Sequence, residues 1–274
     1  MSYAGGKQLI AHRVIELIQP HDHYIEPFFG SGAVLFAKSP SRLETVNDLD
    51  DRLVNFWRVL RDRPEELAWA CAMTPHSRQE FLLAHQSSHD ALEQARRTWT
   101  LITQGRGGRA IRAGWRHVVT RTARQSLPSQ LDGYITRLLD VAERLRNISI
   151  EHRDALELLT AYDAPGTCFY LDPPYLPATR RDGLYCREVT TSYHEDLLDA
   201  LQRVTAQVIL SAYPHPPSTP KPSPTGPSTQ SQPEPAAAPH ATKTSGQTTP
   251  PPWQGGGTHF VSGRLARLAR SLSR

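Results

Sequence analysis

The octapeptide YLDPPYLP, residues 170–177, joins an acidic residue, two prolines and an aromatic residue at the end of an apolar run. Because proline has no N–H and a fixed φ, Pro173 and Pro174 should end a strand in a rigid tip. The Asp172 carboxylate and the Pro173 carbonyl then offer only acceptors, and Tyr175 offers a flat ring. Such a tip suits an amine on a planar ring, because two acceptors draw its hydrogens out of the ring plane and localise its lone pair. A proline-rich turn without chemistry is the alternative.

Two further loops follow stretches with a strand pattern. In YIEPFFGSGAV, Gly30 and Gly32 allow a tight turn and a close approach to a ligand. Glu26 suits a cationic ligand better than a pyrophosphate, and the missing third glycine of a dinucleotide fingerprint disfavours an NAD oxidoreductase. In VNDLD, Asp48 could accept both hydroxyls of a ribose, or it could cap the helix expected at Asp50. An ordinary strand-to-helix turn is the alternative for the glycine loop.

A parallel sheet is needed to bring these loops together. Periodicity predicts helices at residues 7–19, 50–60 and 194–204, the opening of a helix at 33–37, and strands at 23–27, 44–47, 148–151, 168–171 and 207–211. This order predicts an α/β fold: a Rossmann-like sheet with right-handed crossovers and helices on both faces. Ligands of such sheets bind beyond the carboxyl ends of the strands.

The region from residue 63 to 146 interrupts this pattern. It is mostly helical and too long for one crossover, so we interpret it as an inserted domain. Residues 94–131 hold eight arginines and no acidic residue, whereas residues 1–213 hold 25 basic and 26 acidic residues. A basic stripe of this kind favours a polyanion, although a solvated basic face is the commoner explanation. The residues expected to contact phosphates or guanines are Arg96, Arg97, Arg106, Arg109, Arg112, Arg116, Arg121 and Arg124, with Gly105, Gly107 and Gly108 loosening the loop and Trp115 stacking or wedging.

The composition changes abruptly at Pro216. Thirteen of the 23 prolines lie between residues 214 and 252, so the segment cannot bury a core. We therefore expect residues 216–274 to be disordered and the sheet to lack closing strands. Three scattered cysteines without a CxxC pair disfavour a disulfide framework and a metal site. The sequence has no signal-peptide block and no run of 18 apolar residues, so we expect a cytoplasmic protein without a membrane partner.

In their order, YAGGK, EPFFGSG, VNDLD and LDPPY resemble the Dam-type DNA adenine-N6 methyltransferases over about residues 2–213. The resemblance implies S-adenosylmethionine as cofactor and a flipped adenine in double-stranded DNA as substrate. It implies cofactor contacts from Tyr3, Lys7, Glu26, Gly30, Gly32, Asp48, Asp154 and Asp172, and a base site made by Asp172, Pro173, Pro174 and Tyr175. Together with the basic stripe, it leads us to expect DNA contacts from the insert, at Arg106, Arg109, Arg112, Trp115, Arg116, Arg121 and Arg124. The family often has a tryptophan where Tyr3 stands.

The resemblance also divides the chain. It implies a cofactor-binding part at 1–62, an inserted target-recognition domain at 63–146, a catalytic part at 147–215 and the tail at 216–274. Because the family continues with further strands, a catalytically impaired DNA- or cofactor-binding remnant is a second hypothesis. Methylation of a protein or RNA amide is a third, disfavoured because the basic insert suits duplex DNA. We expect a monomer, with a cognate restriction endonuclease as a further candidate partner.

Overall fold

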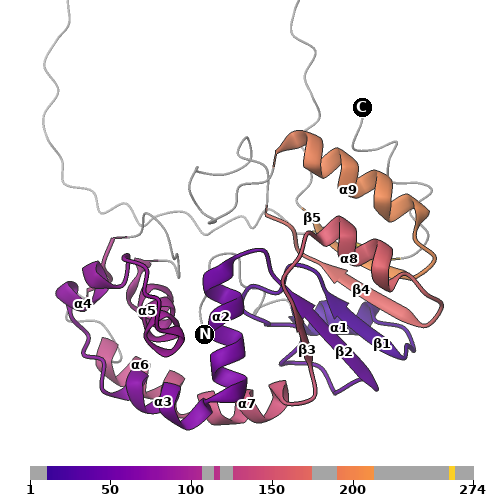
Figure 1. The fold of residues 1–274 in the computed structure, drawn as a ribbon. Helices are drawn as coiled ribbons and strands as arrows, with labels where there is room; N and C mark the ends of the chain where they lie inside the picture. Colours follow the sequence, from indigo (N-terminus) through magenta and orange to yellow (C-terminus); the bar gives the residue numbers. More distant parts are fainter. Residues whose placement is uncertain (1–10, 107–113, 118–125, 175–189, 213–258, 263–274) are drawn as a thin grey trace, which may run out of the picture.

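The computed structural model describes residues 11–106, 114–117, 126–174, 190–212 and 259–262. These residues form a sheet of order β3-β2-β1-β4-β5-β6 with helices on both faces (Figure 1). The strands are β1 (His23–Glu26), β2 (Leu43–Asn47), β3 (Ser149–Glu151), β4 (Thr167–Leu171), β5 (Gln207–Ala212) and β6 (His259–Ser262). Strands β1 to β5 are parallel, and β6 is antiparallel to β5. The predicted α/β fold with a parallel sheet is confirmed.

Helices cover the sheet and fill the region between β2 and β3. Beside the sheet lie α1 (Ala11–Leu17), α2 (Asp51–Asp62), α8 (Ala155–Tyr162) and α9 (Thr191–Arg203). Between α2 and β3 in sequence come α3 (Pro64–Ala72), α4 (Arg78–Leu83), α5 (Ala91–Gln104), α6 (Leu127–Ile135) and α7 (Leu138–Leu145). Figure 1 shows α3, α4, α5 and α6 gathered to one side of the sheet, beyond α2.

The central strand β4 is buried on both faces. Cys168 and Tyr170 join a core that includes residues of α1 and α2, whereas Phe169 and Leu171 pack with α8 and α9. This alternation follows from the period of two residues in a strand, and a strand covered on both faces reads as an apolar run. The tip that follows β4 therefore starts from a rigid base.

The helices between α2 and β3 share the core of the sheet. Leu67, Trp99 and Leu138, from α3, α5 and α7, belong to the same buried cluster as Tyr24 of β1 and Phe56 of α2. An ion pair between Arg144 and Glu44 also ties α7 to β2, and Glu44 is buried. Apolar packing and a charged contact thus fix this region against the sheet.

The structure corrects two predictions. Residues 33–37 form turns rather than a helix, because the chain leaves Gly32 with a positive φ of 65° and the rings of Phe29 and Phe36 pack over it. The second correction concerns the tail, in which we expected no strand. Residues 259–262 pair with 209–212 of β5, so the edge that we expected to be open is covered. The rest of the predicted disordered tail lies outside the described residues.

Candidate active site

Four acidic residues follow the carboxyl ends of four adjacent strands. In spatial order along the sheet they are Asp154 after β3, Asp48 after β2, Glu26 at the end of β1 and Asp172 after β4. Strand order reverses between β1 and β4, and ligands of open parallel sheets bind at such a switch point. The topology therefore brings the predicted acidic residues to one edge.

Glu26 is a buried carboxyl group with 2% of its surface exposed. Its Oε1 accepts a hydrogen bond of 2.9 Å from the Tyr24 hydroxyl, and the Leu35 N–H also donates to the carboxyl group. Burial raises the pKa of Glu26 to about 8, with a further upward contribution from the negative charge of Asp172. A carboxyl group in this state is neutral near pH 7 and would ionise beside a bound cation.

The loop after Glu26 depends on its two glycines. Gly30 and Gly32 have φ values of 50° and 65°, in the region that disfavours side chains. A Cβ on Gly32 would lie 2.5 Å from the Phe36 ring and 2.6 Å from the Phe29 ring. The Trp57 indole N–H donates to the Gly30 carbonyl at 3.1 Å, which fixes the turn against α2.

Asp48 connects the glycine loop with the start of α2. The Gly30 N–H donates to its Oδ2 at 2.8 Å, and the Asp50 N–H donates to its Oδ1 at 3.0 Å. The N-cap of α2 is Asp50, whose side chain accepts from the Arg52 N–H at 3.0 Å, so the capping alternative for Asp48 is wrong. Burial raises the pKa of Asp48 to about 6, so it ionises below neutral pH.

Asn47 lies among the loops of the candidate site and was not predicted from the sequence. Its side chain is buried and donates to the Pro27 carbonyl at 2.9 Å and to the Arg153 carbonyl at 3.0 Å. Its Oδ1 accepts from the Arg153 N–H at 3.0 Å. It therefore joins the loops that follow β1, β2 and β3. An amide at the buried last position of a strand was the one sequence feature that could have revealed it.

Asp154 and the acceptor tip lie at opposite ends of this row. Asp154 caps α8 by accepting from the Leu156 N–H at 2.8 Å, and it also accepts from the Tyr193 hydroxyl at 3.3 Å. At the tip, Asp172 is half-buried, Pro173 is buried, and the Pro174 carbonyl lies 2.8 Å from the His194 Nε2. Tyr175, Tyr3 and Lys7 lie outside the described residues.

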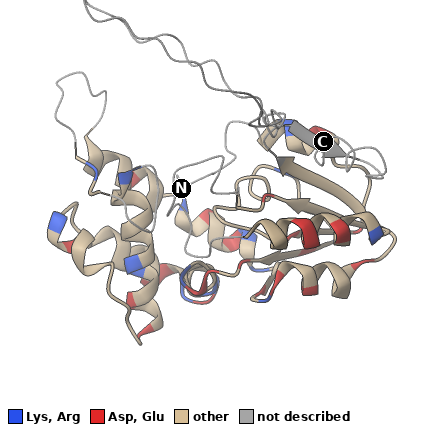
Figure 2. Ribbon diagram, turned by 90° about the horizontal axis from the view of Figure 1, so that it is seen from above, with Lys and Arg blue, Asp and Glu red and all other residues tan. Residues whose placement is uncertain are grey.

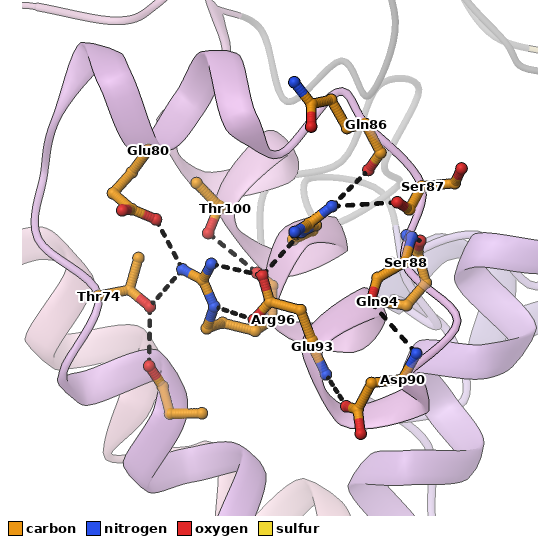
Figure 3. A network of polar contacts seen from close by, with 12 residues as sticks. Thr74, Glu80, Gln86, Ser87, Ser88, Asp90, Glu93, Gln94, Arg96 and Thr100 are labelled. Carbon is orange, nitrogen blue, oxygen red and sulfur yellow. Dashed lines mark hydrogen bonds and ion pairs between the residues drawn. The ribbon is translucent and has the colours of Figure 1, made fainter.

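Two arginines of the predicted basic stripe have structural partners instead. Arg96 donates to both oxygens of Glu93, at 2.6 and 2.8 Å, and to Glu80 at 2.8 Å (Figure 3). Arg97 donates to Glu93 at 2.7 Å. These ion pairs lower the pKa of Glu93 to about 2. Arg96 and Arg97 are thus engaged in ion pairs within the fold, which argues against their predicted role toward a polyanion, and Figure 2 shows acidic residues beside the basic ones in this region.

Arg106, Trp115 and Arg116 meet at the end of α5. Arg106 is exposed, and its N–H donates to the Gly114 carbonyl at 3.0 Å. Arg116 is half-buried and donates to the Gln130 side chain at 2.6 Å. The Trp115 ring stacks on His76 and His117, with centroid distances of 4.6 and 5.7 Å, and the Arg78 guanidinium lies 4.8 Å from its centroid.

These contacts occupy the indole of Trp115, so it does not project as a free wedge. His76, Arg78 and His117 were not predicted here, because nothing local in the sequence links them to Trp115. Arg109, Arg112, Arg121 and Arg124 lie outside the described residues. Among the residues that the structure describes, no group of three or more His, Cys, Asp or Glu side chains could hold a metal ion, and no helix is long and apolar enough to cross a membrane.

Comparison with known proteins adds independent information. Residues 3–216 match the family model described as D12 class N6 adenine-specific DNA methyltransferase. The chain is also similar to the Type II methyltransferase M1.LlaDCHI of Lactococcus lactis subsp. cremoris, with 27% identity over 188 residues. That alignment covers 64% of this chain and 64% of the relative, so the chain spans just under two thirds of the relative's length.

Proposed function

The chain belongs to the D12 class N6 adenine-specific DNA methyltransferases, and on that premise we propose that it methylates N6 of an adenine flipped out of double-stranded DNA, with S-adenosylmethionine as the methyl donor. The observation that carries the proposal is the row Asp154, Asp48, Glu26 and Asp172 along one edge of the sheet. The row has the order of the groups to be bound: adenine of the cofactor, ribose, cationic methionine part, and target base.

The residues of this edge fit the cofactor. Asp48 directly follows β2, and its carboxyl group accepts from the backbone N–H groups of Gly30, Asp50 and Leu49, which would hold it in place to accept from a ribose hydroxyl. Glu26 is buried with a raised pKa, which suits it to a cation. When bound there, S-adenosylmethionine would supply an electrophilic methyl group on its sulfonium. Asp154, Gly30 and Gly32 complete the proposed cofactor set, with Tyr3 and Lys7 at its border.

The acceptor tip would hold the target base. The Asp172 carboxylate and the Pro173 carbonyl accept the two hydrogens of the adenine amine, which localises the nitrogen lone pair toward the methyl group. Pro173 and Pro174 keep these acceptors in place because their φ angles are fixed. Tyr175 would stack on the base. Positioning of this kind contributes much of the rate of a transfer between two bound molecules.

Residues 63–146 would recognise the DNA target, with Arg106, Arg109, Arg112, Arg116, Arg121 and Arg124 neutralising phosphates or reading guanines. We propose that the enzyme acts as a cytoplasmic monomer, with a cognate restriction endonuclease as its functional counterpart. The hypothesis of a catalytically impaired remnant rested on an uncovered outer edge of β5, and β6 covers that edge.

Asp172→Ala tests the proposal directly. Labelled S-adenosylmethionine is incubated with unmethylated duplex DNA and each variant, and cofactor binding is measured separately by calorimetry. We expect transfer by Asp172→Ala to be abolished while cofactor affinity stays within about tenfold, because the carboxylate mainly holds the target amine. Asp199→Ala, an exposed acid on α9, is the matched control. Retained transfer by Asp172→Ala would refute the role of the tip, and binding without transfer by the wild type would favour the remnant hypothesis.

A further inference from the structure

The first turn of α9 reaches two separate parts of the candidate active site. The turn is capped by Thr190, whose side chain accepts from the Tyr193 N–H at 3.2 Å. The Tyr193 hydroxyl donates a hydrogen bond of 3.3 Å to Asp154, beyond β3. His194, the next residue, lies with Nε2 2.8 Å from the Pro174 carbonyl, beyond β4. Consecutive residues of one helix thus contact Asp154, at one end of the acidic row, and Pro174, two residues after Asp172 at the other end.

The His194 contact orients the carbonyl group of Pro174, which the proline ring alone does not fix. The ring of Pro174 fixes φ, but ψ stays free to rotate the following carbonyl. A carbonyl oxygen can only accept, so the His194 Nε2 must carry a proton and donate it. That hydrogen bond fixes the direction of the Pro174 carbonyl, which follows the two proposed acceptors in the tip. The base of the tip is fixed independently by β4, because Leu171 is buried beside Leu210 of β5.

Packing makes α9 a firm anchor for both contacts. Leu197 and Leu201 of α9 are buried in the same cluster as Leu158 and Leu159 of α8 and Phe169 of β4. Figure 1 shows α8 and α9 side by side on this face of the sheet. Because Asp154 caps α8, the Tyr193 contact ties the start of α9 to the start of α8. A shift of α9 would therefore move the tip and Asp154 together.

We propose that His194 and Tyr193 are positioning residues, with His194 orienting the acceptor tip and Tyr193 orienting Asp154. The inference rests on the proposed function, since it assumes that the tip holds the target amine and that Asp154 faces the cofactor. It assigns different kinetic consequences to two adjacent residues. Loss of the His194 contact loosens the site of the base and lowers kcat. Loss of the Tyr193 contact loosens Asp154 and weakens cofactor binding.

The kinetic test compares His194→Ala, His194→Gln and Glu195→Ala. We expect kcat of His194→Ala to fall roughly 10- to 100-fold, because small misplacements of reacting groups have effects of that size. The cofactor Kd should stay within about twofold, which is the split expected for a loss confined to the tip. His194→Gln should recover most of kcat, because its amide N–H can replace Nε2–H as donor. Glu195→Ala, exposed on the same turn, should resemble the wild type.

Tyr193→Phe supplies the complementary arm. We expect its cofactor Kd to rise about three- to tenfold, as for the loss of one hydrogen bond, with kcat within about twofold of wild type. Unchanged kcat in His194→Ala would overturn the inference. An equal loss of kcat in His194→Ala and His194→Gln, accompanied by lower stability of both variants, would also overturn it, because the contact would then serve only the structure.

A spectroscopic measurement keeps the inference testable if the wild type shows no transfer. Nitrogen-15 correlation spectra report which ring nitrogen of His194 carries the proton, and His194→Gln identifies the signal. The inference requires a slowly exchanging proton on Nε2. A neutral ring protonated on Nδ1 alone would overturn it, because that ring cannot donate to the Pro174 carbonyl. Absence of methyl transfer together with the Nε2 proton would instead count against the proposed function and leave the contact at the tip confirmed.

Discussion

Glu26→Gln should be more stable than the wild type, and this difference in the free energy of unfolding should grow as the pH rises. Glu26 is buried, and its pKa is raised from 4.5 to about 8, chiefly by burial. Below 4.5 the carboxyl group is protonated in both the folded and the unfolded chain. Between 4.5 and about 8 only the folded chain keeps the proton, so folding stability of the wild type falls with rising pH through this window. Above about 8 both states are ionised and the loss is complete.

The magnitude follows from the same values. Each pKa unit corresponds to about 1.4 kcal/mol, so the ionised form of Glu26 costs the fold at most about 5 kcal/mol above pH 8. Gln has nearly the same shape and keeps an oxygen that can accept from the Tyr24 hydroxyl and the Leu35 N–H. The advantage of Glu26→Gln in the free energy of unfolding should therefore be small near pH 5 and reach several kcal/mol near pH 9.

Urea unfolding of both proteins at a series of pH values measures this difference, because titrations common to both cancel. Glu157→Gln, which removes an exposed carboxylate of α8, is the control and should show no comparable trend. A difference between Glu26→Gln and wild type that stays level from pH 5 to 9 would refute the reasoning. The functional counterpart is measurable by calorimetry in buffers of different ionisation enthalpy. Near pH 7, roughly nine in ten Glu26 side chains are protonated, so binding of the cationic cofactor should release close to one proton.

Three further outcomes are expected. Replacing Arg106, Arg109 and Arg112 together by Ala should weaken DNA binding and lower the slope of log affinity against log salt by roughly 0.9 for each lost phosphate contact; an unchanged slope, measured by fluorescence anisotropy, would mean that these side chains form only a solvated face. Gly32→Ala should destabilise the fold by roughly 2–4 kcal/mol in urea unfolding, because its Cβ would meet the Phe36 and Phe29 rings and its φ is positive. Gly133→Ala is the control and should not destabilise the fold, because its Cβ would meet nothing within 4 Å. Glu93→Gln should lose less stability in acid than the wild type does. The pKa of Glu93 is lowered to about 2, so its stabilising contribution is present above pH 4.5 and is lost as the pH falls toward 2. If stability falls equally in acid in both proteins, the ion pairs of Glu93 with Arg96 and Arg97 do not have this role.

The sequence predicted those features whose physical cause is local. Glu26, Asp48 and Asp172 each end or follow an apolar run, and parallel pairing then brings the ends of such runs to one edge. The glycine loop was also predicted, because Gly30 and Gly32 allow conformations that other residues disfavour. The helix at residues 33–37 was not formed, since packing of two phenylalanine rings over Gly32 outweighs local helix preference.

Features that depend on contacts distant in sequence could not be predicted. Asn47 bonds to Arg153, 106 residues away, and His194 contacts Pro174, 20 residues away. The ion pair between Arg96 and Glu93 was not foreseen for a different reason. The window without acidic residues began at Gln94, so it omitted Glu93, which lies one helical turn from Arg96 and is its nearest partner.

Strand β6 shows how composition can hide a structural element. An uncovered β5 would present a row of N–H and C=O groups, and such edges promote association between chains. Pairing of residues 259–262 with β5 satisfies part of that edge, although a proline-rich segment precedes them in the sequence. Strand pairing is made by backbone groups and depends little on side-chain type. Four residues are therefore enough to form β6, and so short a strand barely changes the composition of the segment. Because β5 also pairs with β4 up to Leu171, covering its outer edge helps to hold the strand from which the acceptor tip begins. The C-terminal part of the chain is therefore connected, through two neighbouring strands, to the residue on which methyl transfer is proposed to depend.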